Sequence, residues 1–513
     1  MAVQKWEVFE LLLHGIKEGN PFVSVKLTAQ FTYQGSEDNK TLCVDGFYDG
    51  DGIYKVRFMP DRIGIWSYCT YSNYKELDNI TGQMECIDND FDNHGMVRIK
   101  NTYHFCYEDG TIYYPFGTTC YAWIHQPTAI QKQTIETLKN TGFNKIRMCV
   151  FPKFYANNNE EPPMYPYQGQ APNQWDFERF NPPFFQALEN HIIQLGNMGI
   201  EVDLILFHPY DKGHWGFDSM GKEADLRYLS YIIARFSAFH NVWWSMANEY
   251  DYIKSKTLED WNTYIEYVSK KDIYKHLLSI HNAERFFDNW HPNITHASIQ
   301  IGTNSSKGEV STGFGMYRMH RDIYHKAVIF DEVGYEGDLM QRWGCMSAKE
   351  IVDKYWKAIC SGTYMSHGET YSSDDDIIWW AKGGQLKGEA WKRILFLKKI
   401  VEESHTEGLE PLDLWWILNG VGVHGQYYLF YFSDIPMNRW TFKLPAFKKP
   451  VIDMGTKFVV DIIDTWNMTI ERLPVEYVVD TSDRYYYQSK ATPFIELKGR
   501  KNIALRIVKK ELL

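Results

Sequence analysis

Asn241-Val242-Trp243-Trp244-Ser245-Met246-Ala247-Asn248-Glu249-Tyr250 is an apolar run that ends in an adjacent amide and carboxylate. Such an ending is unusual for a packed strand, because a buried ionised carboxylate is costly unless it is paired or takes part in chemistry. It is typical of a parallel barrel, where the carboxyl ends of the strands carry side chains into a pocket. A second run, Ala327-Val328-Ile329-Phe330-Asp331-Glu332-Val333-Gly334-Tyr335, has the same form.

Strand and helix patterns alternate around these two runs, from residue 96 to residue 407, which predicts a parallel sheet with crossover helices. The predicted strands are 113–120, 143–150, 200–208, 241–248, 276–281, 296–302, 327–332 and 362–367. The clearest helical patterns are 128–140, 183–198, 222–239, 258–270 and 347–360, with a final helix at 386–404. Eight strands in this rhythm match an α/β fold, the (β/α)8 TIM barrel. The segment 152–183, rich in Pro and Asn, is expected to be a long loop over the barrel mouth, and a second insertion is expected at 304–320.

Short strands flank the barrel on both sides. Residues 1–95 contain an alternating run at 22–31 and turn residues at 48–52 and 60–64, which predicts an N-terminal β-sandwich. After Gly408 the short strands return, at 427–432, 457–463, 468–471, 485–488 and 502–508. Residues 408–513 are therefore predicted to form a C-terminal β-sandwich. A division into three domains suits a chain of 513 residues, which is too long for one compact core.

Composition excludes several classes of partner. The net charge of −11 and the lack of a basic run argue against a nucleic acid. No stretch approaches membrane-spanning length and no apolar leader is visible, so no membrane is expected. The eight cysteines are scattered without a Cys-x-x-Cys pair, which indicates free thiols and a cytoplasmic location. The aromatic share of 16% fits both carbohydrate contact and large β-rich cores.

Neither a metal nor a cofactor is expected. His291 and His296 do not have the helical spacing of a metalloprotease, and the acidic triplet 374–376 lacks the further ligands of a calcium loop. No phosphate-binding loop, nucleophile elbow or dinucleotide fingerprint is present. The chemistry is therefore assigned to the carboxylates at the strand ends.

Two carboxylates across a cleft are the groups that glycosidic cleavage requires. One carboxylic acid protonates the departing oxygen, and one carboxylate faces the anomeric carbon. If the carboxyl groups of Glu249 and Glu332 lie about 5–5.5 Å apart, the second attacks directly and configuration is retained. Glu249 is then the acid and base, and Glu332 the nucleophile. Asn248 is expected to donate a hydrogen bond to the substituent beside the anomeric carbon.

At these positions the chain resembles a known family. Asn-Glu ending the fourth strand and Glu ending the seventh are similar to clan A retaining glycoside hydrolases. Further motifs resemble apiosidase-like glycosidases that carry an N-terminal β-sandwich and a C-terminal β domain. These motifs lie at 6–10, 20–22, 46–52, 57–60, 64–66, 244–250 and 331–337. The resemblance implies fold and reaction type, but it leaves the sugar open because the group includes both furanosidases and pyranosidases.

Further residues are predicted to line the substrate site. Arg147 is expected to hydrogen-bond the nucleophile and keep it ionised, the alternative being a structural ion pair between strands. The other predicted substrate contacts are His208, His281, Trp123, His125, His367, Glu369, Trp379 and Trp380, with Gln300 as a weaker candidate. For each of these the competing interpretation is a packed or hydrogen-bonded structural residue.

Two questions about function stay open at this point. Asp331 and Glu336 lie close to Glu332, but Asp331 is expected to face the opposite side of the strand, so Glu332 is preferred as nucleophile. The predicted function is an exo-acting hydrolase of oligosaccharides or glycosides, because a polymer would not reach a cytoplasmic enzyme. The alternatives are a non-catalytic carbohydrate-binding protein on a barrel scaffold and a transglycosylase that uses the same residues. A homo-oligomer in which the loop 33–40 reaches a neighbouring subunit is also considered.

Overall fold

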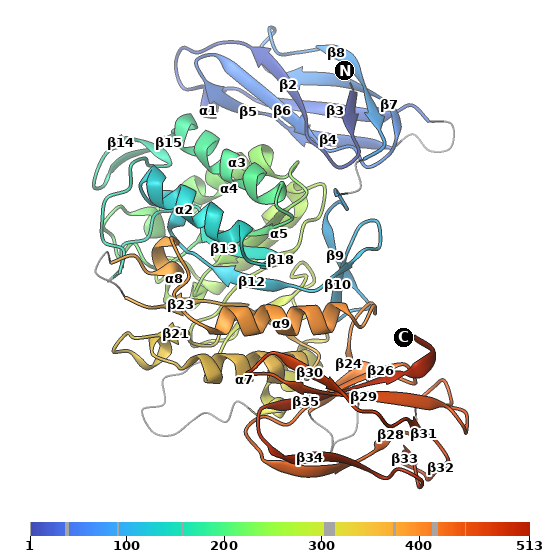
Figure 1. Cartoon of the computed structure of the whole chain (residues 1–513). Coiled ribbons are helices and arrows are strands. Elements are labelled where there is room, and N and C mark those ends of the chain that lie inside the picture. Colours follow the sequence, from blue (N-terminus) through green and yellow to red (C-terminus); the bar gives the residue numbers. More distant parts are fainter. Residues whose placement is uncertain are drawn as a thin grey trace.

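The computed structural model describes residues 2–35, 40–89, 92–155, 157–301, 313–372, 376–412, 419–446 and 448–512. A central barrel carries one β domain at each end, with the N-terminal domain and the C-terminal domain on opposite sides (Figure 1). Parts of five predicted segments lie outside the described residues. They are 36–39 of the loop 33–40, 156 of the loop 152–183, 302 of the strand 296–302, 304–312 of the second insertion, and Asp374 and Asp375 of the acidic triplet.

All eight predicted barrel strands are present in one parallel sheet. They are β12 (Phe116–Thr119), β13 (Lys145–Cys149), β16 (Glu201–Phe207), β17 (Val242–Ala247), β18 (Leu278–Ser279), β19 (Ala297–Gln300), β20 (Val328–Glu332) and β22 (Tyr364–His367). Neighbours follow the order β18-β17-β16-β13-β12-β22-β20-β19. A parallel bridge between His281 and Ser298 joins the two ends of this order. The predicted α/β TIM barrel is therefore confirmed.

The predicted helices cover the outside of the barrel. They are α2 (Thr128–Lys139), α3 (Pro182–Gly196), α4 (Lys222–Phe236), α5 (Leu258–Lys271), α7 (Ala348–Ile359) and α9 (Ala390–Glu402). Capping boxes at Thr257 and Ser347 satisfy the first amides of α5 and α7 and fix where these helices begin. Helix α6 (Phe314–Tyr324) was not predicted, because most of it falls in the segment 304–320 that was assigned to an insertion. Its buried residues Tyr317, His320 and Arg321 nevertheless have helical spacing.

The predicted loop 152–183 contains a β-hairpin. Its strands are β14 (Tyr167–Gln170) and β15 (Gln174–Phe180), paired antiparallel. The rings of Tyr167 and Phe180 are buried and stack at 5.2 Å, and Tyr167 also packs beside Phe217 at 5.9 Å. The assignment of this whole segment to a loop was therefore wrong. Aromatic packing onto the barrel orders a stretch whose composition favours turns.

The N-terminal domain is a sandwich of two sheets. One sheet has the order β1-β8-β7-β3-β4 and the other β2-β6-β5. The strands are β1 (Ala2–Gln4), β2 (Phe9–His14), β3 (Leu27–Tyr33), β4 (Thr41–Asp45), β5 (Phe47–Gly50), β6 (Ile53–Phe58), β7 (Gly64–Ser72) and β8 (Thr81–Ile87). Phe31 and Phe58 stack between the sheets at 4.1 Å. Buried ion pairs then tie the domain to α3 and α4, with Arg57 to Glu189 at 2.6 Å and Arg235 to Asp49 at 2.6 Å.

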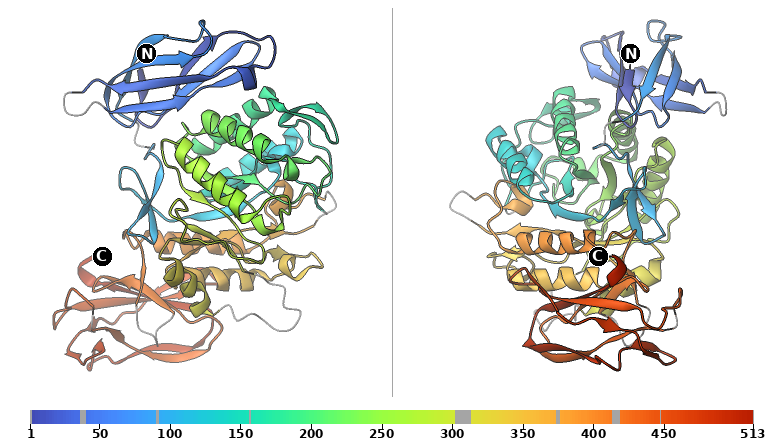
Figure 2. Two further views of the ribbon diagram at one scale, coloured as in Figure 1. Left: turned by 180° about the vertical axis from the view of Figure 1, so that it is seen from behind. Right: turned by 45° about the vertical axis from the view of Figure 1, so that its right-hand side comes forward.

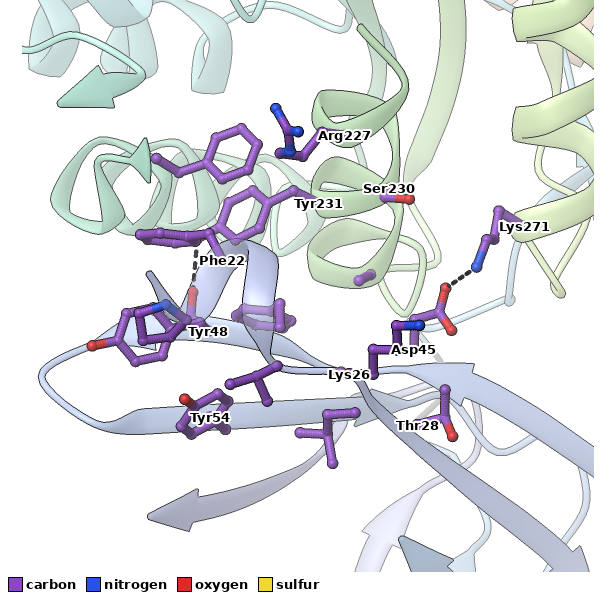
Figure 3. Close-up of a pocket in the computed structure, with 17 residues that line it drawn as sticks. Phe22, Lys26, Thr28, Asp45, Tyr48, Tyr54, Arg227, Ser230, Tyr231 and Lys271 are labelled. Carbon is purple, nitrogen blue, oxygen red and sulfur yellow. Dashed lines mark hydrogen bonds and ion pairs between the residues drawn. The ribbon is translucent and has the colours of Figure 1, made fainter. Parts of the chain in front are cut away.

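A cavity of about 340 Å³ remains at this domain junction, between the sandwich and α4 (Figure 3). Phe22, Tyr48 and Tyr231 lie toward one end and the ion pair of Asp45 and Lys271 toward the other. Neither Glu249 nor Glu332 lines this cavity. It is a feature of the junction and is separate from the barrel mouth.

A small sheet of β9 (Val97–Lys100), β10 (His104–Tyr107) and β11 (Ile112–Tyr113) lies between the sandwich and the barrel. Phe105 of this sheet packs beside Trp243 at 5.6 Å, and Trp243 belongs to barrel strand β17. The predicted domain limit near residue 95 therefore falls just before a sheet that packs against the barrel.

The C-terminal domain is built around a sheet of order β24-β25-β26-β35-β29-β30, with β31 beside β29. Its strands are β24 (Glu410–Pro411), β25 (Gly420–Val423), β26 (Tyr427–Tyr431), β29 (Lys457–Asp464), β30 (Thr469–Arg472), β31 (Tyr477–Val478) and β35 (Ile503–Lys509). Two smaller sheets pair β27 (Met437–Thr441) with β34 (Phe494–Arg500), and β28 (Lys443–Pro445) with β33 (Tyr486–Gln488) and β32 (Thr481–Ser482).

The C-terminal domain rests on α7 and α9, as the views in Figures 1 and 2 agree. Tyr431 donates from its hydroxyl to Asp353 of α7 at 2.9 Å, and Arg393 of α9 donates to the Trp466 carbonyl at 2.9 Å. The eight cysteines are unpaired thiols. None of the described helices is long and apolar enough to cross a membrane.

Candidate active site

The end of β17 brings two polar side chains to the barrel mouth. Asn248 and Glu249 directly follow the strand, and both are buried. Glu249 has a left-handed backbone with φ 47°, a conformation that is uncommon for a residue other than glycine. Because the chain turns sharply there, two consecutive side chains need not face opposite sides as they would in a regular strand. Strain of this kind is often found at functional sites.

The end of β20 also departs from regular strand geometry. Its register against β19 shifts so that Phe330 pairs with Ile299 and Glu332 with Gln300, which leaves Asp331 as the extra residue of a bulge. Asp331 and Glu332 consequently reach the same guanidinium, that of Arg147, at 3.8 and 4.0 Å. The prediction that Asp331 faces away from Glu332 is therefore wrong, because the bulge breaks the two-residue alternation on which it rested.

Tyr121 and Arg147 connect the two strand ends. The Tyr121 hydroxyl is hydrogen-bonded to Glu332 Oε1 and lies 3.2 Å from Asn248 Oδ1. Arg147 Nη2 donates to Asn248 Oδ1 at 3.2 Å, and its Nη1 is 4.0 Å from Glu332 Oε1. Since Oδ1 of Asn248 accepts from Arg147, the amide is oriented with Nδ2 as the group left to donate. Asn248, Arg147 and Glu332 thus lie together, but Arg147 is too far from Glu332 for the predicted hydrogen bond. Arg147 instead bonds Asn248 and makes ion pairs with Asp203 and Asp331, so the alternative interpretation, an ion pair between strands, also describes it.

The two glutamates share an environment that disfavours charge. Burial raises the pKa of Glu249 to about 7 and that of Glu332 to about 8. Burial alone would leave a proton on Glu332, but the contacts favour the opposite distribution. Glu332 Oε1 accepts from Tyr121 and faces Arg147, whereas Glu249 Oε2 has no hydrogen-bond partner among the described residues. Hydrogen bonds to a carboxylate stabilise its ionised form, so these contacts favour a charged Glu332 over a charged Glu249.

Beneath this pair the barrel interior holds a buried charge cluster. Lys145 contacts Asp203 at 2.7 Å and Asp331 at 3.0 Å, and Arg147 Nε lies 3.4 Å from Asp203. Burial would raise the pKa of Asp331, but Lys145, Arg147 and two serine hydroxyls outweigh it and hold that pKa well below its usual range. Asp331 is therefore a charged anchor for the two cations, and its oxygens are occupied.

Glu336, the other alternative nucleophile, is also occupied. It accepts from the backbone amides of Glu389 and Ala390 at the start of α9, at 2.9 Å each. Glu369 accepts in the same way from the Lys387 and Gly388 amides, on the neighbouring pair of short strands β21 (Glu336–Gly337) and β23 (Glu369–Thr370). Glu336 caps the N-terminal turn of α9, where the helix dipole favours negative charge, and Glu369 binds the two residues that precede its N-cap.

Trp380 lies in a group of rings beside the carboxylates. Its ring centroid is 5.6 Å from that of Tyr121, 5.8 Å from Tyr155 and Tyr335, and 5.1 Å from Trp343. Its indole N–H has no partner among the described residues. This position suits the predicted stacking wall for a sugar ring.

Trp123 and Trp379 lie in the hydrophobic core. Trp123 is fully buried, with its indole next to His191 of α3 at 4.6 Å and its N–H directed at Met148 Sδ. Trp379 is also buried and donates to Thr118 Oγ1 at 2.8 Å. The structure does not bring either ring to the network around Glu332, so the packing interpretation holds for both.

Three of the four predicted histidines are used in structural contacts. Both ring nitrogens of His208 are bound to the main chain, at Phe151 O and Tyr210 N. His125 bonds the Cys149 carbonyl and stacks on Phe184 of α3 at 5.8 Å. His367 bonds Thr118 Oγ1 and stacks on Phe143 at 5.1 Å, outside the barrel. Burial lowers the pKa of all three, to about 3 for His208 and His367 and about 4 for His125.

His281 differs from these three. It is fully buried, and neither ring nitrogen has a partner among the described residues. Burial lowers its pKa well below the usual value, and Arg147 acts in the same direction while Asp331 opposes it. Its imidazole therefore lies neutral inside the barrel, next to the charge cluster. Gln300, the weaker candidate, faces Glu249 and lowers the pKa of that carboxyl.

The sequence reasoning missed Tyr121 and Lys153. Tyr121 follows the end of β12 by two residues, so the rule that located Glu249 and Glu332 would have found it. Lys153 lies in the Phe151-Pro152-Lys153 turn after β13, and no pattern in that turn points to it. No group of three or more metal-ligating side chains occurs in the ranges that the structure describes.

Comparisons with known proteins agree with this geometry. The family model described as "Apiosidase-like, catalytic domain" matches residues 99–408. Two domain families of unknown function match on either side, DUF5060 over residues 2–73 and DUF5605 over residues 415–508. A search of curated proteins found no match.

Solved structures extend the similarity to the whole chain. A crystal structure described as a "putative glycoside hydrolase" from Bacteroides vulgatus ATCC 8482 is 41% identical, with a TM-score of 0.93 and 99% of each chain covered. A glycoside hydrolase family 5 structure from the same strain is 13% identical, with a TM-score of 0.55, covering 82% of this chain and 95% of that one. The second similarity concerns the fold alone.

Proposed function

The chain belongs to the apiosidase-like glycoside hydrolases, and on that premise we propose that it is a retaining glycosidase with Glu332 as nucleophile and Glu249 as acid and base. The observation that carries the proposal is the link between the two strand ends. Tyr121 and Arg147 hold Asn248 next to Glu332, and Glu249 follows Asn248 directly. Asp331 and Glu336 have their oxygens occupied by buried partners.

In the first step Glu332 attacks the anomeric carbon while Glu249 gives its proton to the glycosidic oxygen. The contacts prepare each group for this task. The Tyr121 hydroxyl and the Arg147 guanidinium favour the ionised form of Glu332, and burial keeps Glu249 protonated near neutral pH. Asn248 Nδ2 is oriented to donate to the hydroxyl beside the anomeric carbon, a bond that strengthens as positive charge develops on the sugar.

In the second step the glycosyl ester on Glu332 is hydrolysed. Glu249, now ionised, takes a proton from water, and the water oxygen attacks the anomeric carbon from the side that the leaving group has vacated. The ester breaks and Glu332 is released as a carboxylate, so the configuration of the anomeric carbon is retained.

We further propose that the substrate is a short oligosaccharide or glycoside cleaved from its end, and that the enzyme works in the cytoplasm. Two features support the small substrate. The hairpin β14–β15 packs beside Phe217, in the segment that follows β16, and adds a wall on that side of the barrel. The rings around Trp380 enclose another side. The unpaired thiols are consistent with a reducing compartment.

The test is release of nitrophenol from a panel of α- and β-linked pyranosides and furanosides. The wild-type protein is compared with Glu332→Gln and with Glu249→Ala, the latter with and without azide. We expect Glu332→Gln to abolish the activity and azide to restore turnover to Glu249→Ala, because a small anion can replace the water that needs a base.

The outcomes separate the competing functions. Activity that survives Glu332→Gln would reject this nucleophile. Sugar binding without turnover of any glycoside would favour the non-catalytic carbohydrate-binding protein. Glycosyl transfer to added sugar that exceeds hydrolysis would identify a transglycosylase using the same residues.

A further inference from the structure

Lys153 is a buried cation without a hydrogen-bond partner among the described residues. Its nearest ring belongs to Tyr121, whose hydroxyl is hydrogen-bonded to Glu332 and lies 3.2 Å from Asn248 Oδ1, and Glu249 follows Asn248 directly. The Lys153 side chain is 1% exposed, and its Nζ has no hydrogen-bond partner among the described residues. Such an arrangement is costly unless something replaces the lost hydration. The proposed mechanism gives this residue no task, so its position needs a separate explanation.

Four aromatic rings surround the ammonium group. Nζ lies 3.8 Å from the centroid of Tyr121, 4.1 Å from Tyr210, 4.4 Å from Trp380 and 5.4 Å from Tyr155. We call these four side chains the aromatic cage. Ring faces attract a cation electrostatically, and they do so more strongly when the cation is removed from water. The cage therefore stabilises a charged lysine without giving it a hydrogen bond.

Hydrogen bonds to the main chain fix the positions of Lys153 and of the aromatic cage. The Asn158 side chain donates to the Lys153 carbonyl at 2.5 Å, and the Phe154 amide donates to the Tyr210 carbonyl at 2.7 Å. The Tyr121 amide donates to the Trp380 carbonyl at 2.9 Å. Lys153 and the cage are thus held in place by segments that follow four barrel strands, β12, β13, β16 and β22.

Lys153 adds a third cation to the charged side chains at this end of the barrel. The other two, Lys145 and Arg147, contact Asp203 and Asp331 beneath the site. The proposed mechanism adds one further negative charge at every stage. That charge is on Glu332 before attack, and it is on Glu249 once Glu332 has become an ester.

From this arrangement, and resting on the proposed function, we propose that Lys153 is the counter-cation of Glu249. Its ammonium group offsets the negative charge that Glu249 acquires when its proton passes to the leaving oxygen. Arg147, 4.0 Å from Glu332 Oε1, serves the nucleophile, and Lys153 serves the acid and base. Lys153 is therefore a positioning residue for charge and does not touch the reacting atoms.

The absence of a direct ion pair is part of this function. A lysine bonded to Glu249 would favour the carboxylate so strongly that the group could no longer act as an acid at neutral pH. Held in the cage, the ammonium stabilises the carboxylate while still allowing protonation. The pKa shifts of the two groups agree with this. Burial raises the pKa of Glu249, and Lys153 is the largest influence that lowers it. Burial lowers the pKa of Lys153 to about 8, and Glu249 is among the groups that raise it.

Other titratable groups face this pair from each neighbouring element. Cys149 and Arg147 of β13 act on Lys153, raising and lowering its pKa respectively. Asp251 raises the pKa of Glu249, and Arg147 lowers it. The phenols of Tyr155 and Tyr335 also face Glu249, and burial holds their pKa values above the usual one. None of these groups except Lys153 is a cation held in the aromatic cage.

The experiment measures the titration of Glu249 directly, so it does not depend on a known substrate. Protein labelled with carbon-13 at the glutamate carboxyl is titrated by NMR, and Glu249→Gln identifies the signal. In Lys153→Met, which keeps the apolar stem, we expect Glu249 to titrate roughly one pH unit higher, because a neighbouring cation moves a carboxyl by about that much or more. Lys153→Arg, which restores a cation, should bring the value back toward that of the wild-type protein.

Lys326→Met is the matched control. Burial also lowers the pKa of Lys326 to about 8, but its Nζ donates to the carbonyls of His291 and Ile294. It directly precedes β20 at the amino end of the strand, opposite the end that carries Glu332. We expect this variant to leave the titration of Glu249 unchanged.

A second measurement applies if Lys153→Met does not fold. Coupling between two sites is reciprocal, so Glu249→Gln must lower the pKa of Lys153 by as much as Lys153 lowers that of Glu249. Titration of the lysine ε-carbon signals, wild type against Glu249→Gln, measures this shift. An unchanged Glu249 titration in folded Lys153→Met, or an equal shift in Lys326→Met, would overturn the inference.

Failure of this inference and failure of the proposed function give different results. If a glycoside is cleaved with Glu249 as acid but its titration ignores Lys153, the counter-cation role is rejected and the glycosidase stands. If Glu249 responds to Lys153 but no glycoside is cleaved, the charge coupling stands and the proposed function is rejected.

Discussion

Adjacent carboxylates at the end of β20 should respond to neutralisation in opposite ways. Asp331→Asn removes the anion that Lys145 contacts at 3.0 Å and Arg147 faces at 3.8 Å, in a fully buried cluster. Breaking a buried ion pair from one side typically costs about 3–5 kcal/mol. The hydrogen bonds from Ser298 and Ser366 offset little of this, because an asparagine oxygen accepts them more weakly than a carboxylate does.

Glu332→Gln should instead leave the fold at least as stable. The amide oxygen can still accept from Tyr121, and the cost of burying a carboxylate disappears. Burial raises the pKa of Glu332 above 4.5, and the contacts with Tyr121 and Arg147 hold it below the value of about 8 that burial alone would give. The wild-type protein therefore loses stability as pH rises from about 4.5 toward the pKa of Glu332, by less than the ~5 kcal/mol that a pKa of about 8 would give at about 1.4 kcal/mol per pH unit. The glutamine variant does not.

Urea unfolding at pH 5 and pH 8, followed by tryptophan fluorescence, measures both effects. We expect a free energy of unfolding for Asp331→Asn that is lower than wild type at both pH values. For Glu332→Gln we expect equality near pH 5 and a gain at pH 8, together with complete loss of glycosidase activity. An Asp331→Asn protein of wild-type stability, or a Glu332→Gln protein that is destabilised by several kcal/mol, would refute this division between anchor and nucleophile.

Three further predictions follow from single contacts. Tyr121→Phe removes a donor to Glu332, so the pKa of Glu332 should rise. The acidic limb of the kcat/KM profile should then move to higher pH and activity should fall about 10–100-fold. An unmoved limb would contradict this. The alkaline limb should fall near pH 7, because Glu249 must be protonated and burial raises its pKa to about 7; a limb below pH 5.5 would assign the acid to another group. Arg57→Met breaks the buried ion pair to Glu189 at the sandwich junction, so the midpoint of thermal unfolding should fall by several degrees, at a cost of about 3 kcal/mol, while KM stays at the wild-type value.

The barrel could be predicted from the sequence because its strands are buried and its helices are amphipathic. Eight apolar runs alternate with helical periods, and each run lies within a few residues of an observed strand. The hairpin β14–β15 and helix α6 were missed for a different reason. Both lie in segments that were assigned to insertions as a whole, although β15 alternates in burial and the buried residues of α6 have helical spacing.

The carboxylates were predictable for a similar reason, since a charge at the end of an apolar run is a local signal. Their neighbours were harder to predict, because their roles depend on which face of an element turns inward. Asp331 reaches Arg147 only through a bulge, which alternation does not show. His208 and His367 end their strands as predicted, yet their ring nitrogens are used by the main chain and by Thr118. Lys153 becomes noticeable only when four rings from separate segments meet around it.

Trapping the glycosyl-enzyme tests the central claim most directly. Glu249→Ala is incubated with the cleaved aryl glycoside, whose leaving group needs no acid, so that the intermediate accumulates because no base activates water. Intact mass followed by peptide mapping then locates the added sugar. The account predicts one glycosyl group on Glu332. An adduct on Asp331 or Glu336, or turnover in Glu249→Ala without any adduct and with inverted configuration in the first product, would contradict it.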